Sequence, residues 1–113
     1  MKSKIIALSK NEEFKNLLQQ KKISNKYATI FFGILKSKNK DKLNISFVAK
    51  RKIGNAVKRN KIKRRLKNII NAATKKISIK FDYSYLVIAK PTMLNNDYTN
   101  IKETLFQSLE KIK

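Results

Sequence analysis

The alternation of apolar and polar residues predicts three helices, and the first of them lies near the N-terminus. Segment 8–20 reads LSKNEEFKNLLQQ and has the spacing of an amphipathic helix. Ser9 stands three residues before Glu12, which is the pairing of a capping box and indicates that Ser9 is the N-cap. The apolar stripe of this helix consists of Phe14, Leu17 and Leu18.

Three runs of β-branched and aromatic residues have the composition of strands. Runs 28–35 and 43–49 are joined by a polar link, which indicates an antiparallel pair. The third run covers residues 83–89 and stops before Pro91, because proline cannot donate to a strand ladder. A short extra strand before Tyr27 is left open by the sequence.

Two more helices are predicted, one on each side of the third strand run. The second helix covers residues 55–74, and the third begins near Asn96 or Asp97. The third helix carries an apolar stripe made of Tyr98, Ile101, Leu105, Leu109 and Ile112. Because the second helix separates runs 43–49 and 83–89, these strands can lie parallel as a crossover unit. The order α-β-β-(β)-α-β-α predicts an α+β two-layer sandwich with a small mixed sheet and a basic crossover helix.

Length and charge narrow the class of the protein. With 113 residues the chain is expected to form a single domain over 1–113. Its formal net charge of +21, from 28 Lys+Arg against 7 Asp+Glu, far exceeds the roughly 2–8 charges that suit a small domain. Such an excess opposes compaction and indicates an anionic partner. Because no apolar run approaches the roughly 20 residues that cross a bilayer, and no signal peptide is evident, we expect a cytoplasmic protein without a membrane partner.

The residue types that the chain lacks exclude most kinds of active site. There is no Cys and no His, which removes disulfides, thiolate nucleophiles, imidazole bases and the usual zinc sites. Among the carboxylates only Glu12 and Glu13 are close in sequence, and adjacent residues do not share a helix face as an acid/base pair would. We therefore expect no catalytic residue, no metal site and no cofactor bound by the protein alone.

The basic residues are concentrated in the middle of the chain. All four arginines lie in the stretch 51–65, and the forty residues from 42 to 81 contain no carboxylate. Arginine offers a planar fork of donors that can grip a phosphate at two points, which lysine does not offer. Since solvated helix faces usually alternate the sign of charge, the exclusion of acids favours nucleic-acid binding over a merely solvated face.

The second helix divides its residues between an apolar stripe and a basic surface. The stripe is formed by Ile62, Leu66, Ile69 and Ala73. The residues that face away from it are Lys61, Arg64, Lys67 and Asn68, and those along its flanks are Lys58, Arg59 and Arg65. We predict that the stripe packs on the protein and that the other residues meet RNA or DNA. The predicted nucleic-acid-binding residues are Lys50, Arg51, Lys52, Asn55, Lys58, Arg59, Asn60, Lys61, Lys63, Arg64, Arg65 and Lys67.

Residues 52–66, KIGNAVKRNKIKRRL, resemble the signature of the bacterial ribonuclease P protein subunit. That signature has a basic lead, a Gly, Ala-Val, then Arg-Asn-Arg, a branched apolar residue and Lys-Arg, and these elements occur here in order. Lys61 stands where the third residue of Arg-Asn-Arg is usually Arg, which keeps the charge and loses the fork. The resemblance extends over nearly the whole chain, from segment 8–14 to segment 85–90, in which Lys90 replaces the usual Arg.

The resemblance implies an α+β fold and a place in a ribonucleoprotein. In the family, the basic helix and its preceding loop contact the catalytic RNA subunit. A cleft between the first helix and the sheet holds the 5′ leader of precursor tRNA. Phe14 and Phe32 fall at positions similar to aromatic residues of that cleft, so both are predicted to bind the leader, and packing in the core is the alternative role for each.

The function implied by the resemblance is endonucleolytic removal of the 5′ leader from precursor tRNA. The chain would be the non-catalytic protein component of this RNA-based endoribonuclease, and Mg²⁺ would act at the RNA active site of the holoenzyme. The implied partners are the catalytic RNA subunit and precursor tRNA, with a protein that is monomeric outside the holoenzyme. A small basic ribosomal protein or RNA chaperone without a cleavage role is the alternative that composition leaves open.

Overall fold

A mixed sheet lies at the centre of the computed structural model, which describes residues 5–6, 11–34, 43–77, 79, 83–94 and 97–112. Its strands are β1 (Ile5–Ile6), β2 (Lys21–Ser24), β3 (Ala28–Gly33), β4 (Leu43–Val48) and β5 (Ser84–Ala89). The helices are α1 (Asn11–Leu18), α2 (Ala56–Lys76) and α3 (Tyr98–Glu110), with short 3₁₀ turns η1 (Arg51–Ile53) and η2 (Pro91–Met93). These elements confirm the predicted α+β class.

The described strands follow the order β1-β4-β5-β3-β2 across the sheet. Strands β4 and β5 are parallel and α2 connects them, which confirms the predicted crossover unit. Strand β3 is antiparallel to β5, and β2 is antiparallel to β3. Strand β2 settles the open question of a short strand before Tyr27. Strand β1, which pairs in parallel with β4, has only 2 residues and is too short to show a period in the sequence.

The predicted antiparallel pairing of runs 28–35 and 43–49 is wrong. Strands β3 and β4 do run in opposite directions, but β5 lies between them and pairs with both. The physical reason is the crossover. Helix α2 returns the chain to the edge of β4, and β5 then occupies the position that a hairpin partner of β4 would need. Tyr85 accordingly stands opposite Ile45 on one side and opposite Phe32 on the other.

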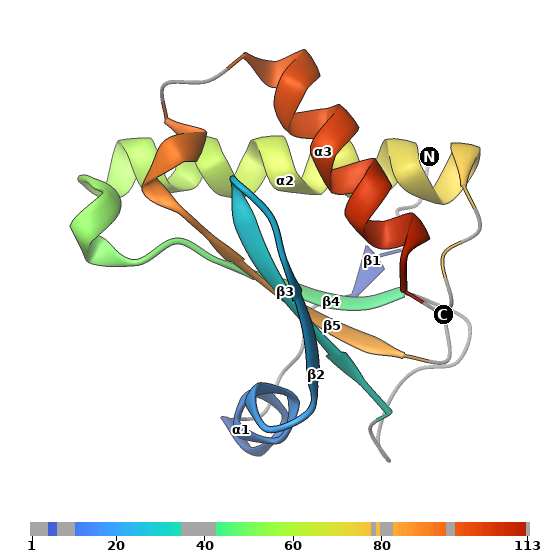
Figure 1. Ribbon diagram of the computed structural model, residues 1–113. Helices are drawn as coiled ribbons and strands as arrows, with labels where there is room; N and C mark the ends of the chain where they lie inside the picture. Colours follow the sequence, from blue (N-terminus) through green and yellow to red (C-terminus); the bar gives the residue numbers. More distant parts are fainter. Residues whose placement is uncertain are drawn as a thin grey trace.

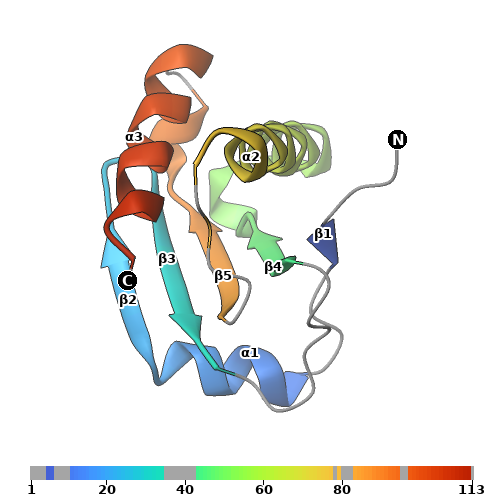
Figure 2. The same ribbon diagram turned by 90° about the vertical axis from the view of Figure 1, so that its right-hand side faces the viewer.

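Helices cover the two faces of the sheet unequally. Helices α2 and α3 lie over one face, and the short α1 lies under the other (Figure 1). Figure 2, a view from the side, shows α2 and α3 next to each other with α1 across the sheet. The main core fills the space between the sheet and the α2/α3 layer. A smaller cluster under α1 consists of buried Leu17 and Leu86, with Phe14, Phe31, Val48 and Ile88 packed against them.

Helix α3 follows its predicted pattern closely. Its N-cap residue is Asp97, in agreement with the predicted start. The buried members of its stripe are Ile101, Leu105, Leu109 and Ile112, and partly buried Tyr98 packs against the main core. The 3.6-residue period was therefore sufficient to identify the face that packs on α2 and the sheet.

Helix α1 agrees with its prediction only in part. Leu17 is fully buried, but Leu18 is 47% exposed, so its predicted place on the apolar stripe is wrong. Leu18 follows Leu17 by about 100° around the helix, which turns it toward solvent. Ser9, the predicted N-cap, lies outside the described residues.

The turn between β2 and β3 is joined to distant parts of the chain through Asn25. The Oδ1 atom of Asn25 accepts hydrogen bonds from the backbone N–H groups of Tyr27 (2.8 Å) and Ala28 (2.9 Å). Its Nδ2 atom donates to Ser108 Oγ in α3 at 2.9 Å. Lys90, which follows β5, donates from Nζ to the carbonyl oxygen of Asn25 at 2.6 Å. Asn25 thereby connects the β2–β3 turn with α3 and with the end of β5.

Replacing Asn25 by Ala should lower the free energy of unfolding by about 2–3 kcal/mol. The substitution removes three side-chain hydrogen bonds, each with a net contribution of about 0.5–1.5 kcal/mol. Urea denaturation measures the change. Asn68→Ala, at an exposed position of α2, is the control and should change the free energy of unfolding by less than about 0.5 kcal/mol. A loss for Asn25→Ala no larger than that of the control contradicts the role of Asn25.

Candidate nucleic-acid interface

Helix α2 is held against the sheet by one stripe of apolar residues. Its buried members are Ile62, Leu66, Ile69, Ile70 and Ala73, which confirms the predicted stripe and adds Ile70. Every other position of the helix is exposed or half-buried. The helix contains no acidic residue, so its whole remaining surface is basic or neutral.

Most of the predicted nucleic-acid-binding residues are exposed. The exposed members of the set are Lys50, Arg51, Lys52, Asn55, Lys58, Asn60, Lys61, Lys63, Arg64 and Lys67. Arg59 and Arg65 are half-buried. The set spans residues 50–67, from the residue before η1 to the twelfth residue of α2, and this stretch of chain contains no carboxylate.

Arg59 departs from its predicted place on a flank of α2. It precedes Ile62 by three residues and Leu66 by seven, so its side chain begins on the apolar stripe. The Nε atom of Arg59 is buried and has no hydrogen-bond partner among the described residues. Leaving a buried donor unpaired costs roughly 1–3 kcal/mol.

Asn55 has a structural role that the sequence-based prediction did not include. Its Oδ1 atom accepts a hydrogen bond from the backbone N–H of Lys58 at 3.0 Å, which makes Asn55 the N-cap of α2. The preceding Gly54 has an extended backbone, with φ 160° and ψ −169°. A Cβ atom on Gly54 would lie 2.8 Å from Lys58 Cδ. Gly54 therefore makes room for the side chain of Lys58 and does not serve a left-handed turn.

One flank of α2 faces a cavity of about 350 Å³ beside β4. Lys63 and Lys67 line this cavity from α2, and Phe14 lines it from α1 together with residues 45–48 of β4. Strand β1 pairs with only the first two residues of β4, so among the described residues the rest of that edge has no strand neighbour. Cations, an aromatic ring and a strand edge thus meet in one cavity.

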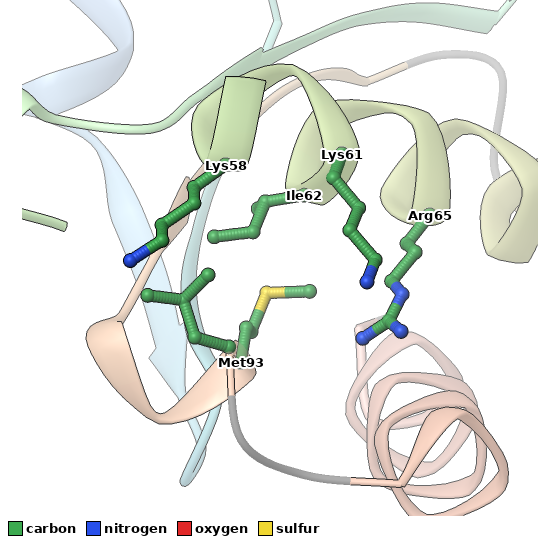
Figure 3. Close-up of a pocket in the computed structure, with 6 residues that line it drawn as sticks. Lys58, Lys61, Ile62, Arg65 and Met93 are labelled. Atoms are coloured by element: carbon green, nitrogen blue, oxygen red, sulfur yellow. The ribbon is translucent and has the colours of Figure 1, made fainter. Parts of the chain in front are cut away.

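The other flank of α2 faces a smaller cavity, which we call the α2/η2 cavity. Its volume is about 180 Å³, and its lining residues are Lys58, Lys61, Ile62, Arg65, Met93 and Leu94 (Figure 3). The sequence predicted that these cations lie on the surface of α2. It did not predict that η2 packs beside them.

Two aromatic rings are brought together on the face of the sheet that α1 covers in part. Phe14 of α1 and Phe31 of β3 are both half-buried and pack against the same small cluster. Lys22 Nζ in the neighbouring strand β2 lies 6.0 Å from the centroid of the Phe31 ring. This face therefore combines partly exposed rings with a cation.

The structure does not place Phe32 beside Phe14. Phe32 is 8% exposed, belongs to the main core on the opposite face and meets Tyr83 edge to face at a centroid distance of 5.6 Å. Successive residues of a strand point to opposite faces, so Phe31 and Phe32 cannot share one face. Phe32 therefore takes the alternative role of core packing, and Phe31 is the aromatic residue of β3 that packs on the α1 side.

Metal sites and membrane-spanning helices are absent from the described residues. No group of three or more Asp or Glu side chains in this part of the chain could hold a metal ion. No helix in the same residues is long and apolar enough to cross a membrane. The fold and the surface together define a small basic α+β protein whose exposed cations suit a polyanion.

Comparison with known proteins identifies the family. The family model described as Ribonuclease P matches residues 3–113. A ribonuclease P protein component from Carboxydothermus hydrogenoformans is 33% identical over 110 residues, which cover 94% of this chain and 90% of that protein. One from Mesoplasma florum is 31% identical over 105 residues, which cover 93% and 92%. The chain belongs to the ribonuclease P protein family.

Solved structures give the same fold. The ribonuclease P protein from Thermotoga maritima matches with a TM-score of 0.80 at 23% identity, over 96% of this chain and 98% of that one. The ribonuclease P protein from Staphylococcus aureus matches with a TM-score of 0.78 at 22% identity, over 95% and 94%. The predicted family and fold are confirmed, and the reading as a ribosomal protein or RNA chaperone is not favoured.

Removal of the Asn55 cap should destabilise α2. We expect Asn55→Ala to lower the free energy of unfolding by about 1 kcal/mol, because the N–H of Lys58 loses its acceptor. Asn55→Ser keeps an oxygen that can accept the bond and should recover most of the loss. Thermal or urea denaturation measures both variants, and equal losses for Ala and Ser would contradict a capping role.

Proposed function

We propose that the chain binds the catalytic RNA of ribonuclease P through η1 and α2. The observation that carries this proposal is the exposure of the cations in this segment without a single carboxylate between residues 42 and 81. Each cation that contacts a phosphate releases counterions, so affinity should fall steeply with salt. The proposed contacts are the predicted nucleic-acid-binding residues, with Arg59 contributing only its accessible atoms and Asn55 combining contact with capping.

We also propose that the face beside α1 binds the 5′ leader of precursor tRNA. Phe14 and Phe31 offer half-buried rings there, and Lys22 stands above the Phe31 ring. Lys63 and Lys67 extend the same region toward α2. Single-stranded nucleic acid is bound by stacking of bases on rings while cations follow the phosphates, and this face supplies both.

In this proposal the RNA performs the reaction and the protein assists it. The reaction is hydrolysis of one phosphodiester bond, which leaves a 5′ phosphate on the mature tRNA. Mg²⁺ ions held by the RNA would supply the activated water and the charge stabilisation. The chain would position the leader and screen the repulsion between the phosphates of substrate and RNA. Because the chain has no His or Cys, we assign it no catalytic residue.

The proposal includes a cytoplasmic protein that is monomeric outside the ribonucleoprotein. A net charge of +21 supports the monomeric state, because two copies of so basic a surface repel each other. Assembly with RNA removes this repulsion by supplying phosphates.

Arg64→Gln should weaken binding of the catalytic RNA and reduce the stimulation of cleavage at low magnesium. Arg64 is exposed on the side of α2 opposite the apolar stripe, so the substitution removes a phosphate contact without disturbing the core. We expect the slope of log affinity against log salt to fall by roughly 1. The measurement is 5′ cleavage of a precursor tRNA by a bacterial ribonuclease P RNA, together with a salt titration of binding.

The control for this test is Lys111→Gln, which removes one charge from an exposed residue after α3. It should leave the salt slope and the stimulation of cleavage close to those of wild type. Failure of the wild-type protein to stimulate cleavage would contradict the proposed function. Equal effects of both variants would contradict the assignment of the contact to α2.

Phe31→Leu should weaken binding of leader-bearing tRNA by about 1–3 kcal/mol, the usual contribution of stacking one base on an aromatic ring. Binding of mature tRNA to the holoenzyme should not change, because mature tRNA has no leader. Phe106→Leu in α3 is a matched control, since Phe106 is also half-buried and has Lys102 Nζ at 5.7 Å from its ring centroid. A loss that is equal for tRNA with and without a leader rules out the leader contact.

A further inference from the structure

The α2/η2 cavity combines three cations with an apolar floor. Lys58, Lys61 and Arg65 reach it from two turns of α2. Figure 3 shows Lys61 and Arg65 extending toward one side of Met93 and Lys58 extending past its other side. Ile62 and Met93 are buried beneath them, and Leu94 is half-buried at the margin. The cavity is thus basic at its rim and apolar at its base.

Among the described residues, the cations of this cavity have no acidic partner. None of the lining residues is acidic, and within the described part of the chain Lys58, Lys61 and Arg65 form no ion pair. Lys61 and Arg65 lie on one side of Met93 and Lys58 lies on the other, and an anion placed beside Lys61 and Arg65 reduces the repulsion between these positive charges. The rim of the cavity is therefore suited to a phosphate, and Arg65 can bind it through two donors.

The position of Lys58 depends on Gly54. A Cβ at residue 54 would lie 2.8 Å from Lys58 Cδ and 3.3 Å from Lys58 Cβ, so any larger residue would displace this side chain. The backbone of Gly54 is extended, a conformation that alanine also adopts. The absence of a side chain at residue 54 thus serves the placement of one cation at the cavity.

The apolar floor indicates a ligand that is more than a bare phosphate. Ile62, Met93 and Leu94 offer no hydrogen bond from their side chains, whereas a ribose or base offers a matching flat surface. The volume of about 180 Å³ is smaller than the roughly 300–1,000 Å³ of sites for drug-sized ligands. A single nucleotide unit, partly open to solvent, suits this combination of size, charge and apolar surface.

We propose that the α2/η2 cavity binds one unpaired nucleotide of the catalytic RNA. The phosphate lies beside Lys61 and Arg65, the base or ribose lies against Leu94 above Met93, and Lys58 lies on the other side of Met93. The nucleotide is unpaired because a base inside a duplex is stacked and cannot reach an apolar floor, whereas bulged and single-stranded bases can. This inference rests on the proposed function, since it names the RNA segment that one flank of α2 would contact.

Methionine methyl NMR offers a specific test, because Met1 and Met93 are the only methionines of the chain. Full-length protein labelled at the methionine methyl groups is titrated with AMP, inorganic phosphate, a blunt RNA duplex, a single-stranded oligonucleotide and the catalytic RNA. We expect AMP, the single strand and the catalytic RNA to shift the Met93 signal saturably through the ring current of a nearby base. Phosphate and duplex should shift it much less, and Met1 serves as the internal reference.

Four variants link the signal to the cavity. Arg65→Gln and Gly54→Ala should weaken the AMP response of Met93 on the order of fivefold or more, the first by removing a phosphate contact and the second by displacing Lys58. Lys75→Gln removes the same charge from an exposed position near the end of α2 and should leave the response unchanged. Leu94→Ala should weaken binding of the single strand on the order of fivefold while duplex binding stays constant.

The outcomes separate the cavity from the proposed function. A Met93 signal that ignores AMP, or that responds equally to phosphate, overturns the nucleotide site. Equal losses for Arg65→Gln and Lys75→Gln also overturn it, since general charge would then explain binding. A response to AMP without one to the catalytic RNA means that the ligand is a free nucleotide and that the RNA assignment is wrong. In each case, stimulation of precursor cleavage by wild type would leave the proposed function standing.

Discussion

The packing of α2 on the sheet is the interaction on which the geometry of the whole surface depends. Five residues, Ile62, Leu66, Ile69, Ile70 and Ala73, are buried along one stripe, so the rotation of the helix is fixed as well as its position. That rotation directs some cations toward β4 and others toward η2. Turning the helix by one residue, about 100°, would bury a charge, and a buried unpaired charge costs several kcal/mol. Apolar packing therefore determines where the positive charges lie.

The same packing has to overcome repulsion within the helix. Like charges at i,i+3 and i,i+4 cost about 0.2–0.5 kcal/mol per pair, and Lys61, Arg64 and Lys67 form such a series. Complete burial of one Leu or Ile side chain contributes about 1.5–3 kcal/mol. Because the stripe buries several such side chains, α2 can remain helical with an outer surface that carries many cations and no acidic residue. The repulsion that remains on this surface is the part that a polyanion would remove.

The helices and strands could be predicted from the sequence because their apolar periods are contained in short segments. The pairing of the strands could not be predicted, because it depends on residues far apart in the chain. The stripe of α2 and the N-cap of α3 follow from spacing alone. The insertion of β5 between β3 and β4 depends on the path of a crossover that spacing does not record. The prediction that Phe32 lies in the cleft came from the resemblance, and the alternation of residues in β3 could not correct it. Helices cover both faces of the sheet, so β3 is apolar on both sides and its alternation does not reveal which ring faces α1.

The arginines of α2 constrain the shape of any RNA that binds them all. Successive residues are about 100° apart, so Arg59 and Arg64 are separated by about 140° around the axis, and Arg64 and Arg65 by about 100°. The three side chains thus start from different sides of the helix: Arg59 from the side of the apolar stripe, Arg64 from the exposed side and Arg65 from the side of η2. A straight duplex lying along one side would meet one or two of these groups. An RNA that contacts all three arginines would therefore have to approach the helix from more than one side, as the segments of a folded RNA can.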